Sequence, residues 1–255
     1  MDHWPKILII TPSLNQGKFI RQTIDSVLNQ NYPNLEYIVV DGGSTDETLE
    51  VLKSYGDKFL WISEKDQGQS DAINKGFNMA TGDILAFINS DDYYMPNILD
   101  LVARTFMETH CDWVSGDYKI VDPSGRSIQS YIVIYKEILR KFSSKTLFYV
   151  ANYIIQPSTF WTRKVWCSAG PMDTNLDYSM DYDFFVKAFQ ISKPVILNQT
   201  LSAFRIHPSA KGNTHYVKQF DLGLQILKRY CDNQVIITAH RLHNVMIKLA
   251  YRFLK

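Results

Sequence analysis

Residues 84–92 have the sequence ILAFINSDD, in which an apolar run ends on two adjacent carboxylates. The run from Ile84 to Ile88 is short and uninterrupted, which is typical of a strand buried on both faces. Its polar end, Asn89 to Asp92, suits either a solvated turn or a site for a divalent cation, because carboxylates and amides serve in both. The remainder of the sequence has to decide between these two interpretations.

Three similar apolar runs precede this one, and helical patterns separate the four runs. The earlier runs are KILII at Lys6–Ile10, EYIVV at Glu36–Val40 and FLWIS at Phe59–Ser63. Continuous apolar strands that alternate with helices are typical of a parallel sheet covered on both faces. The first half of the chain therefore predicts an α/β fold with a Rossmann-like, mostly parallel central sheet.

Helical spacing of apolar residues occupies 19–30, 44–56 and 70–82. We expect Ser44 or Thr45, together with Glu47, to cap the second helix, and Gly82 to end the third. Later in the chain, the sequence Pro-Ser-Gly at 123–125 predicts a turn between two strands. We expect a loop and helix over 169–190, one more strand and a polar loop over 194–215, and then C-terminal helices.

The composition describes a chain with an ample core and a balanced charge. It has 255 residues, 45% of them hydrophobic, and a net charge of +1. Bulk charge gives no reason to expect a nucleic-acid partner. The three cysteines, Cys111, Cys167 and Cys231, lack the spacing of a zinc site or a disulfide framework, so we expect reduced thiols. No apolar run approaches roughly 18 residues, and we expect a cytoplasmic protein.

Polar residues gather where the four predicted strands end. These ends lie at 11–15, 41–46, 64–69 and 89–92, and each contains acidic or amide side chains. In an open parallel sheet such ends share one edge, and ligands bind in the crevice outside that edge. The Gly-rich signatures of dinucleotide and P-loop sites are both missing from the sequence, so a cation held by carboxylates is the expected means of handling phosphate.

The same stretches resemble a known family. Residues 11–48 and 63–92, followed by MDYDFF at 180–185 and FRIHPSAKG at 204–212, resemble the inverting nucleotide-sugar glycosyltransferases of glycosyltransferase family 2. The resemblance implies the GT-A fold in a single domain of residues 1–255. It implies a nucleotide-sugar-binding half at 1–115, an acceptor half with the catalytic base at 116–212, and C-terminal helices at 213–255.

The resemblance also implies which residues hold the donor. It implies that Asp41 accepts a hydrogen bond from N3 of a uracil-type base, which favours a UDP- or dTDP-sugar, because a carboxylate is an acceptor for an imide N–H. The other residues that it implies for the nucleotide-sugar site are Thr11, Pro12, Asn15, Asp66, Gln69, Asp71, Asn74, Asp91, Arg205 and Lys211. Of these, Arg205 and Lys211 belong to a loop that is expected to close over the diphosphate.

The metal site is implied by NSDD, which occupies the place of the family's DxD motif. Ser90 departs from this motif, since an acidic residue is expected there. We therefore expect Asp92 to be the direct ligand of Mn²⁺ or Mg²⁺, with His207 as the second metal residue. Asp91 is expected to face the ribose or a metal-bound water.

The catalytic base is implied by MDYDFF, in which Met180 replaces the usual first acidic residue. We assign the base to Asp181, with Asp183 as the alternative. The two side chains point about 200° apart on a helix, so one of them faces the cleft. Without the family, the alternative is that both are ordinary carboxylates of a first helical turn, stabilised there by the helix dipole.

The implied reaction is direct displacement with inversion, in which an acceptor hydroxyl gives its proton to the base. The resemblance implies a glycan or lipid-linked glycan acceptor and a role in cell-surface polysaccharide synthesis. A sugar nucleotidyltransferase and a non-catalytic nucleotide-sugar binder remain open as alternatives. Neither the sugar, nor the linkage, nor the oligomeric state follows from the sequence.

The C-terminal segment 239–255 combines an apolar stripe with a basic flank. The stripe contains Leu242, Val245, Met246, Leu249 and Phe253, and the flank contains Arg241, Lys248, Arg252 and Lys255. Such a helix either lies on an anionic membrane surface, on the inner face of the cell membrane, or packs its stripe against the core. The sequence leaves both alternatives open.

Overall fold

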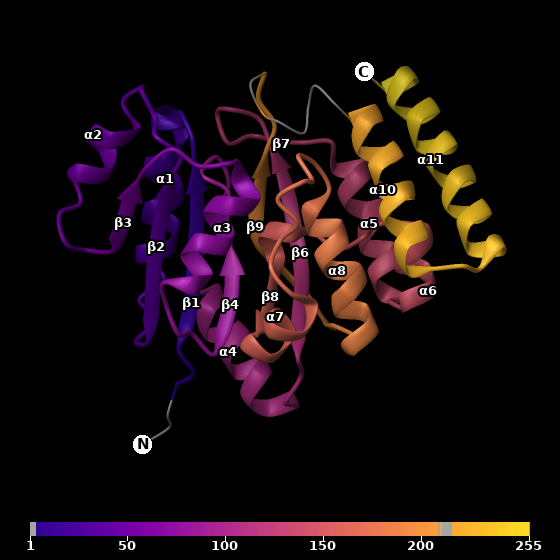
Figure 1. Ribbon diagram of the computed structural model, residues 1–255, viewed down its shortest axis with the longest axis horizontal. Helices are drawn as coiled ribbons and strands as arrows, with labels where there is room; N and C mark the ends of the chain where they lie inside the picture. Colours follow the sequence, from indigo (N-terminus) through magenta and orange to yellow (C-terminus); the bar gives the residue numbers. More distant parts are fainter. Residues whose placement is uncertain (1–3, 209, 211–215, 255) are drawn as a thin grey trace.

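A computed structural model describes residues 4–208, 210 and 216–254 of the chain (Figure 1). Within these residues one mixed sheet runs through the molecule in the strand order β3-β2-β1-β4-β8-β6-β9-β5, and β7 pairs with β6. The strands are β1 (Ile7–Ser13), β2 (Leu35–Asp41), β3 (Leu60–Ser63), β4 (Ile84–Phe87), β5 (Tyr93–Tyr94), β6 (Trp113–Val121), β7 (Ser127–Ile128), β8 (Thr159–Thr162) and β9 (Val195–Arg205).

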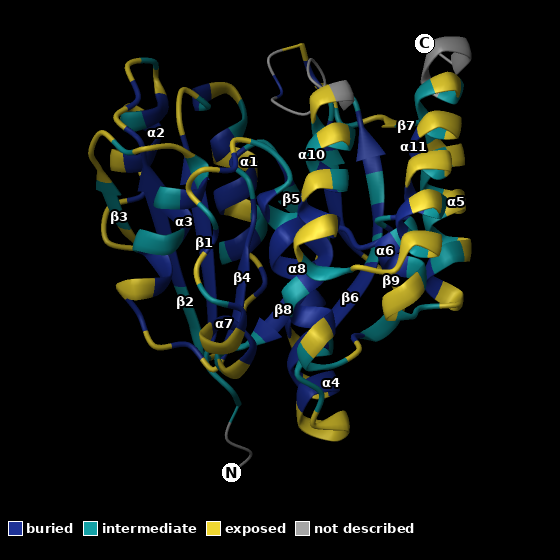
Figure 2. Ribbon diagram, turned by 45° about the vertical axis from the view of Figure 1, so that its right-hand side comes forward, coloured by how far each residue is buried: buried dark blue, intermediate teal, exposed yellow. Residues whose placement is uncertain are grey.

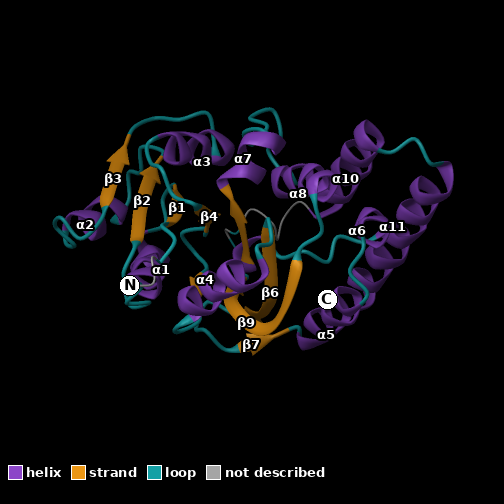
Figure 3. Cartoon of the chain, turned by 90° about the horizontal axis from the view of Figure 1, so that it is seen from below, coloured by secondary structure: helices purple, strands orange, loops and turns teal. Residues whose placement is uncertain are grey.

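The four N-terminal strands are parallel, as expected, and helices cover both of their faces. Alternate residues of β1 enter different cores: Leu8 and Ile10 pack with α3, and Ile7 and Ile9 pack with α1 and α4. Figure 3 shows α3, α7 and α8 on one side of the sheet and α1 and α4 on the other. Because β1, β2 and β4 are largely buried on both faces, these strands are continuously apolar, whereas the edge strand β3 is partly exposed. The α/β prediction is confirmed.

The helices are distributed along the whole chain. They are α1 (Gly17–Leu28), α2 (Thr48–Lys53), α3 (Gln69–Asn78), α4 (Ile98–Thr109), α5 (Ser130–Lys141), α6 (Lys145–Val150), α7 (Arg163–Ala169), α8 (Met180–Ile191), α10 (Tyr216–Tyr230) and α11 (Gln234–Leu254), with a 3-10 turn at Gln156–Ser158. The last two helices lie beside α5, α6 and α8 at one end of the molecule (Figure 1).

Three local predictions differ from the structure. The helix predicted to reach Gly82 ends at Asn78, and the second strand predicted after Pro123 is only the two-residue β7, after which α5 begins at Ser130. The second helix is capped by neither Ser44 nor Thr45: Asp46 accepts hydrogen bonds from the Thr48 backbone and hydroxyl.

Candidate active site

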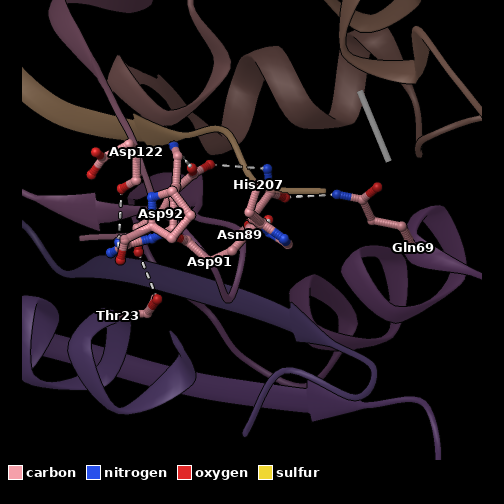
Figure 4. A network of polar contacts seen from close by, with 9 residues as sticks. Thr23, Gln69, Asn89, Asp91, Asp92, Asp122 and His207 are labelled. Atoms are coloured by element: carbon pink, nitrogen blue, oxygen red, sulfur yellow. Dashed lines mark hydrogen bonds and ion pairs between the residues drawn. The ribbon is translucent and has the colours of Figure 1, made fainter. Parts of the chain in front are cut away.

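The candidate active site is built by the antiparallel pairing of β5 with β9. Tyr93 pairs with Ala203, and Tyr94 pairs with Ser202. Because the strands run in opposite directions, the two carboxylates that precede β5 come to lie beside the residues that end and follow β9 (Figure 4). The turn that leaves β4 thereby meets a segment more than 100 residues later in the chain.

Asp91 and His207 form the pair that this arrangement brings together. The Asp91 Oδ2 atom lies 3.0 Å from His207 Nε2, and the Asp91 side chain is 18% exposed. The His207 ring is buried and lies 4.6 Å from the ring of Phe19, centroid to centroid. A carboxylate and an imidazole on adjacent backbones are suitable ligands for Mn²⁺.

Asp92 is placed differently from the expected direct metal ligand. Its side chain is 1% exposed, and its two oxygens accept hydrogen bonds from the Arg205 backbone N–H at 2.8 Å and from Asn89 Nδ2 at 3.2 Å. Burial, reinforced by the neighbouring charge of Asp91, raises the Asp92 pKa well above its usual value. Asp92 thus fixes the end of β9 against the turn, and its carboxylate is enclosed by the protein.

Arg205 is likewise buried, and its hydrogen-bond partners lie within the protein. Its guanidinium is 2% exposed and donates to the backbone oxygens of Asp91 and Pro123 and to the side-chain oxygen of Gln22. It also lies over the ring of Phe19, 4.9 Å from the centroid. Arg205 therefore ties loops together, which differs from the expected contact with a diphosphate. The other expected cation, Lys211, lies outside the described residues.

Asp41 closes the loop after β2. It is fully buried, and its carboxylate accepts hydrogen bonds from the Gly43 and Ser44 backbone N–H groups and from the hydroxyls of Ser44 and Ser63. Ser44 in turn accepts a hydrogen bond from the Asn15 backbone N–H, so the loops after β1 and β2 are locked together. All of these contacts lie at the carboxyl edge of the sheet.

The remaining residues of the first predicted loop line the same edge. Thr11 is buried and accepts a hydrogen bond from the Tyr37 hydroxyl. Pro12 is buried, whereas Asn15 is exposed and its Oδ1 atom accepts a hydrogen bond from the Thr45 backbone N–H. The structure therefore places these residues where the polar strand ends were expected to converge.

The start of α3 connects the NSDD turn with α8. Gln69 Nε2 donates to Asn89 Oδ1 at 2.6 Å, and the next residue, Ser70, donates to the sulfur of Met180, the first residue of α8. Two consecutive residues of one helix thus touch both the turn that carries Asp91 and the helix that carries Asp181. This places the turn that carries Asp91 and Asp92 and the helix that carries the expected base around one helix N-terminus.

The other residues expected to contact the donor here have mainly internal partners. Asp66 accepts a hydrogen bond from the Gly68 backbone, and Asp71 accepts one from Gln67 and pairs with Lys75. Asn74 exchanges two hydrogen bonds with the backbone of Met172. Although Asp71 and Asn74 were expected to present one face to the donor, Asn74 anchors the loop that leads to α8.

The structure distinguishes the two candidate bases. Asp183 is 2% exposed, pairs with Lys187 at 2.7 Å and accepts a hydrogen bond from the Tyr230 hydroxyl. Asp181 is half-buried. Burial raises the Asp181 pKa, although the Tyr182 backbone N–H and the charge of Lys136 oppose this shift.

Lys136 was not identified from the sequence. It lies on α5, and burial together with the nearby charge of Arg140 lowers its pKa to about 8, while Asp181 acts in the opposite direction. Arg140 itself is buried and forms an ion pair with Asp117. The i, i+4 spacing of Lys136 and Arg140 is a helical signal, but their segment begins with the β-branched run Ile132 to Ile134 that predicted a strand.

Within the described residues, no cluster of three or more His, Cys, Asp or Glu side chains has the geometry to hold a metal ion. The Asp91–His207 pair would therefore need further oxygen ligands from outside the chain. Mg²⁺ and Mn²⁺ sites that bind nucleotides commonly have this composition, with one or two protein ligands completed by phosphate and water. The pair fits such an ion.

The sheet order and the polar edge define an α/β protein of the GT-A class, and this part of the expectation is confirmed by solved structures. The chain matches the crystal structure of residues 1–349 of TarS of S. aureus in complex with UDP-GlcNAc, with a TM-score of 0.69, 19% identity and coverage of 90% of this chain and 68% of that one. It covers 41% of a longer TarS structure. A mannosyltransferase of Pyrobaculum calidifontis, PcManGT, in complex with GDP-Man and Mn²⁺, matches with a TM-score of 0.68, 17% identity and coverage of 95% and 74%.

Sequence comparison assigns the family. Residues 8–168, more than half of the chain, match the model of glycosyl transferase family 2. An uncharacterized glycosyltransferase of Rickettsia prowazekii is 29% identical over 265 residues, which covers 98% of this chain and 80% of that protein. The chain belongs to glycosyl transferase family 2 and is a glycosyltransferase.

Proposed function

We propose that the chain transfers a sugar from a nucleotide-diphosphate sugar to an acceptor hydroxyl, with inversion and with the help of Mn²⁺ or Mg²⁺. The observation that carries the proposal is the Asp91–His207 pair at the carboxyl edge of the sheet. Its two proposed metal-binding atoms, Asp91 Oδ2 and His207 Nε2, lie 3.0 Å apart. Ligands of open α/β sheets bind at this edge. The Asp181 carboxylate, on a helix joined to the same edge through Ser70, supplies the second half of the site.

Asp91 and His207 are the residues that would hold the ion. When bound, the ion would offset negative charge that develops on the leaving diphosphate. Asn89 and Gln69 orient the turn that presents Asp91, while Asp92 and Arg205 fix the β9 end that leads to His207. This division of roles replaces the expectation that Asp92 binds the ion directly.

Asp181 acts as the general base in this proposal. Its raised pKa makes it a stronger acceptor for the proton of a hydroxyl than an ordinary exposed aspartate. The charge of Lys136 opposes this rise in the Asp181 pKa by favouring the carboxylate form. The acceptor oxygen attacks the anomeric carbon on the side opposite the nucleotide, so that the configuration inverts without a covalent enzyme intermediate.

The donor is proposed to be a UDP- or dTDP-sugar. The support is Asp41, whose position after β2 matches the base-contacting aspartate implied by the family resemblance. Its carboxylate has four donors from the protein, so a base N–H would bind as an additional donor or replace a hydroxyl of Ser44 or Ser63.

The acceptor is proposed to be a hydroxyl of a glycan or lipid-linked glycan of a cell-surface polysaccharide. A lipid-linked acceptor agrees with the basic helix α11, which could contact a membrane surface. No helix within the described part of the chain is long and apolar enough to cross a membrane.

The proposal is tested by screening the full chain against UDP-, dTDP- and GDP-sugars with Mn²⁺, with Mg²⁺ and with a chelator. We expect a UDP- or dTDP-sugar to raise the melting temperature only with metal, because a ligand that binds the native state stabilises it. With glycan acceptors we expect release of the nucleoside diphosphate and a product of inverted configuration by NMR. Donor binding without any transfer to a panel of acceptors would favour a non-catalytic binder, and a product of retained configuration would contradict direct displacement.

A further inference from the structure

Helix α11 turns its more polar side toward the protein. Its buried residues include His240 and Asn244, of which His240 donates or accepts a hydrogen bond at the Tyr149 carbonyl and Asn244 donates to the Phe220 carbonyl. In contrast, Leu242 and Met246 are each 62% exposed. A surface helix of a globular protein normally shows the opposite arrangement. The expectation that this apolar stripe packs against the core is therefore not met by its described residues.

Helix α5 has the same inverted arrangement. Its one buried side chain is Arg140, which pairs with Asp117. Ile134 and Ile138, one helical turn apart, are 55% and 50% exposed. The sequence did not predict this helix, because the β-branched run Ile132 to Ile134 favours a strand.

The two helices lie side by side and form one surface. The Tyr135 hydroxyl lies 2.7 Å from His243 Nε2, and the two rings are stacked. Figure 2 shows both helices at the same margin of the molecule. We call their exposed apolar side chains the α5/α11 face, which consists of Tyr131, Ile134, Tyr135, Ile138, Leu242, Val245, Met246 and Leu249. Exposed apolar side chains that gather on two adjoining helices are typical of a binding surface.

The charges that border this face are predominantly positive. Helices α5 and α11 together contain six Lys or Arg residues and a single acidic residue, Glu137. Arg140 is buried and Lys136 lies on the inner side of α5, so the described basic side chains at the border are Lys141, Arg241 and Lys248. Glu137 pairs with Lys141, and Lys248 pairs with Asp221 of α10, so among the described side chains the positive excess of the border is carried by Arg241. Apolar side chains flanked by Lys and Arg are typical of helices that lie in the interface of an anionic bilayer.

We propose that the α5/α11 face docks the protein on the surface of an anionic lipid bilayer, with α5 and α11 lying in the headgroup region. A second copy of the chain fits the face less well. A two-fold contact places each surface patch against itself, and here it would bring the positive excess of two copies close together. The proposal adds α5 to the membrane contact considered for α11 and does not depend on sugar transfer.

The position of α5 gives this docking a consequence for the reaction. Lys136, on the opposite side of α5 from Ile134 and Ile138, interacts electrostatically with Asp181. One helix therefore contacts the bilayer on one side and the neighbourhood of the base on the other. A hydroxyl carried by a lipid-linked acceptor would reach the base from the membrane surface without leaving it.

The test is flotation of the full chain with vesicles of phosphatidylcholine alone and of phosphatidylcholine mixed with phosphatidylglycerol. We expect binding to the mixed vesicles to be at least about tenfold stronger and to weaken as salt is added, because surface attraction is screened. The variants Ile134→Ser/Ile138→Ser and Leu242→Ser/Met246→Ser should each reduce binding by about tenfold or more, since each removes two apolar side chains from the interface.

The matched control is Leu60→Ser/Met107→Ser, which changes two exposed apolar side chains on β3 and α4, away from the face. It should float like the parent, and all variants should keep the parental melting temperature. Absence of flotation, equal binding to both vesicle types, or an α5 variant that floats like the parent overturns the proposal. Self-association of the chain in sedimentation velocity, lost in the α5 variant and without flotation, would assign the face to a second copy instead.

Discussion

Asp91 and Asp92 are neighbours in sequence with opposite environments. The Asp91 carboxylate meets His207 at the edge of the site, while the Asp92 carboxylate is enclosed by Asn89 and the backbone of Arg205. From sequence alone the two positions could not be told apart, because the direction of each side chain is set by the pairing of β5 with β9. The same applies to Asp181 and Asp183, of which only Asp183 has an ion-pair partner on its own helix.

The exchange of Asp181 for Asn tests the assignment of the base. We expect turnover to fall by about 10²–10⁴-fold, which is the usual contribution of a positioned base, while donor binding and the melting temperature are kept. Asp183→Asn should keep most of the turnover but lower the melting temperature, because it weakens the contacts of this side chain with Lys187 and Tyr230. Turnover measured with saturating donor, together with thermal unfolding, separates the two variants. Near-parental turnover of Asp181→Asn would show that Asp181 is not the base.

The pH dependence of transfer tests the role of Lys136. A base with a raised pKa must lose its proton to act, so kcat/KM should fall as the pH decreases through the Asp181 pKa, above the usual range of an aspartate. Lys136 opposes this shift, so Lys136→Met should move the acidic limb of the profile to higher pH, and Lys136→Arg should leave it near the parental position. Lys187→Met, which alters the partner of Asp183, serves as the control and should not move the limb.

At the scale of elements, the site depends on the β5–β9 ladder and on Arg205, which joins it to α1 and to the loop after β6. The guanidinium of Arg205 donates to Gln22, Asp91 and Pro123. These partners lie up to 183 residues away from Arg205 in the sequence, so no local pattern could have predicted the contacts. Resemblance to the family identified the segment, but its Arg was expected to face the diphosphate instead of the protein.

Arg205→Lys should therefore behave as a structural change. A lysine cannot reproduce the planar fork of donors, and we expect a loss of about 2–4 kcal/mol in the free energy of unfolding, as for other buried charge networks that lose partners. That corresponds to a melting temperature lower by roughly 4–16 °C for a domain near this size. The control is Arg126→Lys, which changes an exposed ion pair and should shift the melting temperature by less than about 1 °C. An unchanged melting temperature for Arg205→Lys would contradict its structural role.

Helix α5 shows why some elements escaped prediction. Its first residues, Ser130 to Ile134, include a β-branched run that favours a strand. The structure makes it a helix, in which Lys136 and Arg140 face the protein and Ile134 and Ile138 face outward. A pattern rule that assumes apolar residues point inward assigns such a segment wrongly.

At the scale of the whole molecule, the N-terminal sheet was predictable because its four strands are short apolar runs that helical patterns separate. The parallel pairing follows from that pattern, and the polar strand ends meet at one edge as expected, whereas the order β3-β2-β1-β4 is known from the structure. The far part of the sheet mixes parallel and antiparallel pairs, β4 with β8, β8 with β6 and β6 with β9. These long-range pairings depend on the complete fold, and with them the positions of His207 and Asp181.

The most direct test of the central claim is the Mn²⁺ dependence of nucleotide-sugar binding, measured by calorimetry on the parent, His207→Ala, Asp91→Asn and Asp181→Asn. The parent and Asp181→Asn should bind a UDP- or dTDP-sugar with an affinity that rises with Mn²⁺. In Asp91→Asn and His207→Ala, which remove one of the two ligands proposed from the 3.0 Å pair, this dependence should be lost. Metal-dependent binding that survives unchanged in both of these variants would contradict the account.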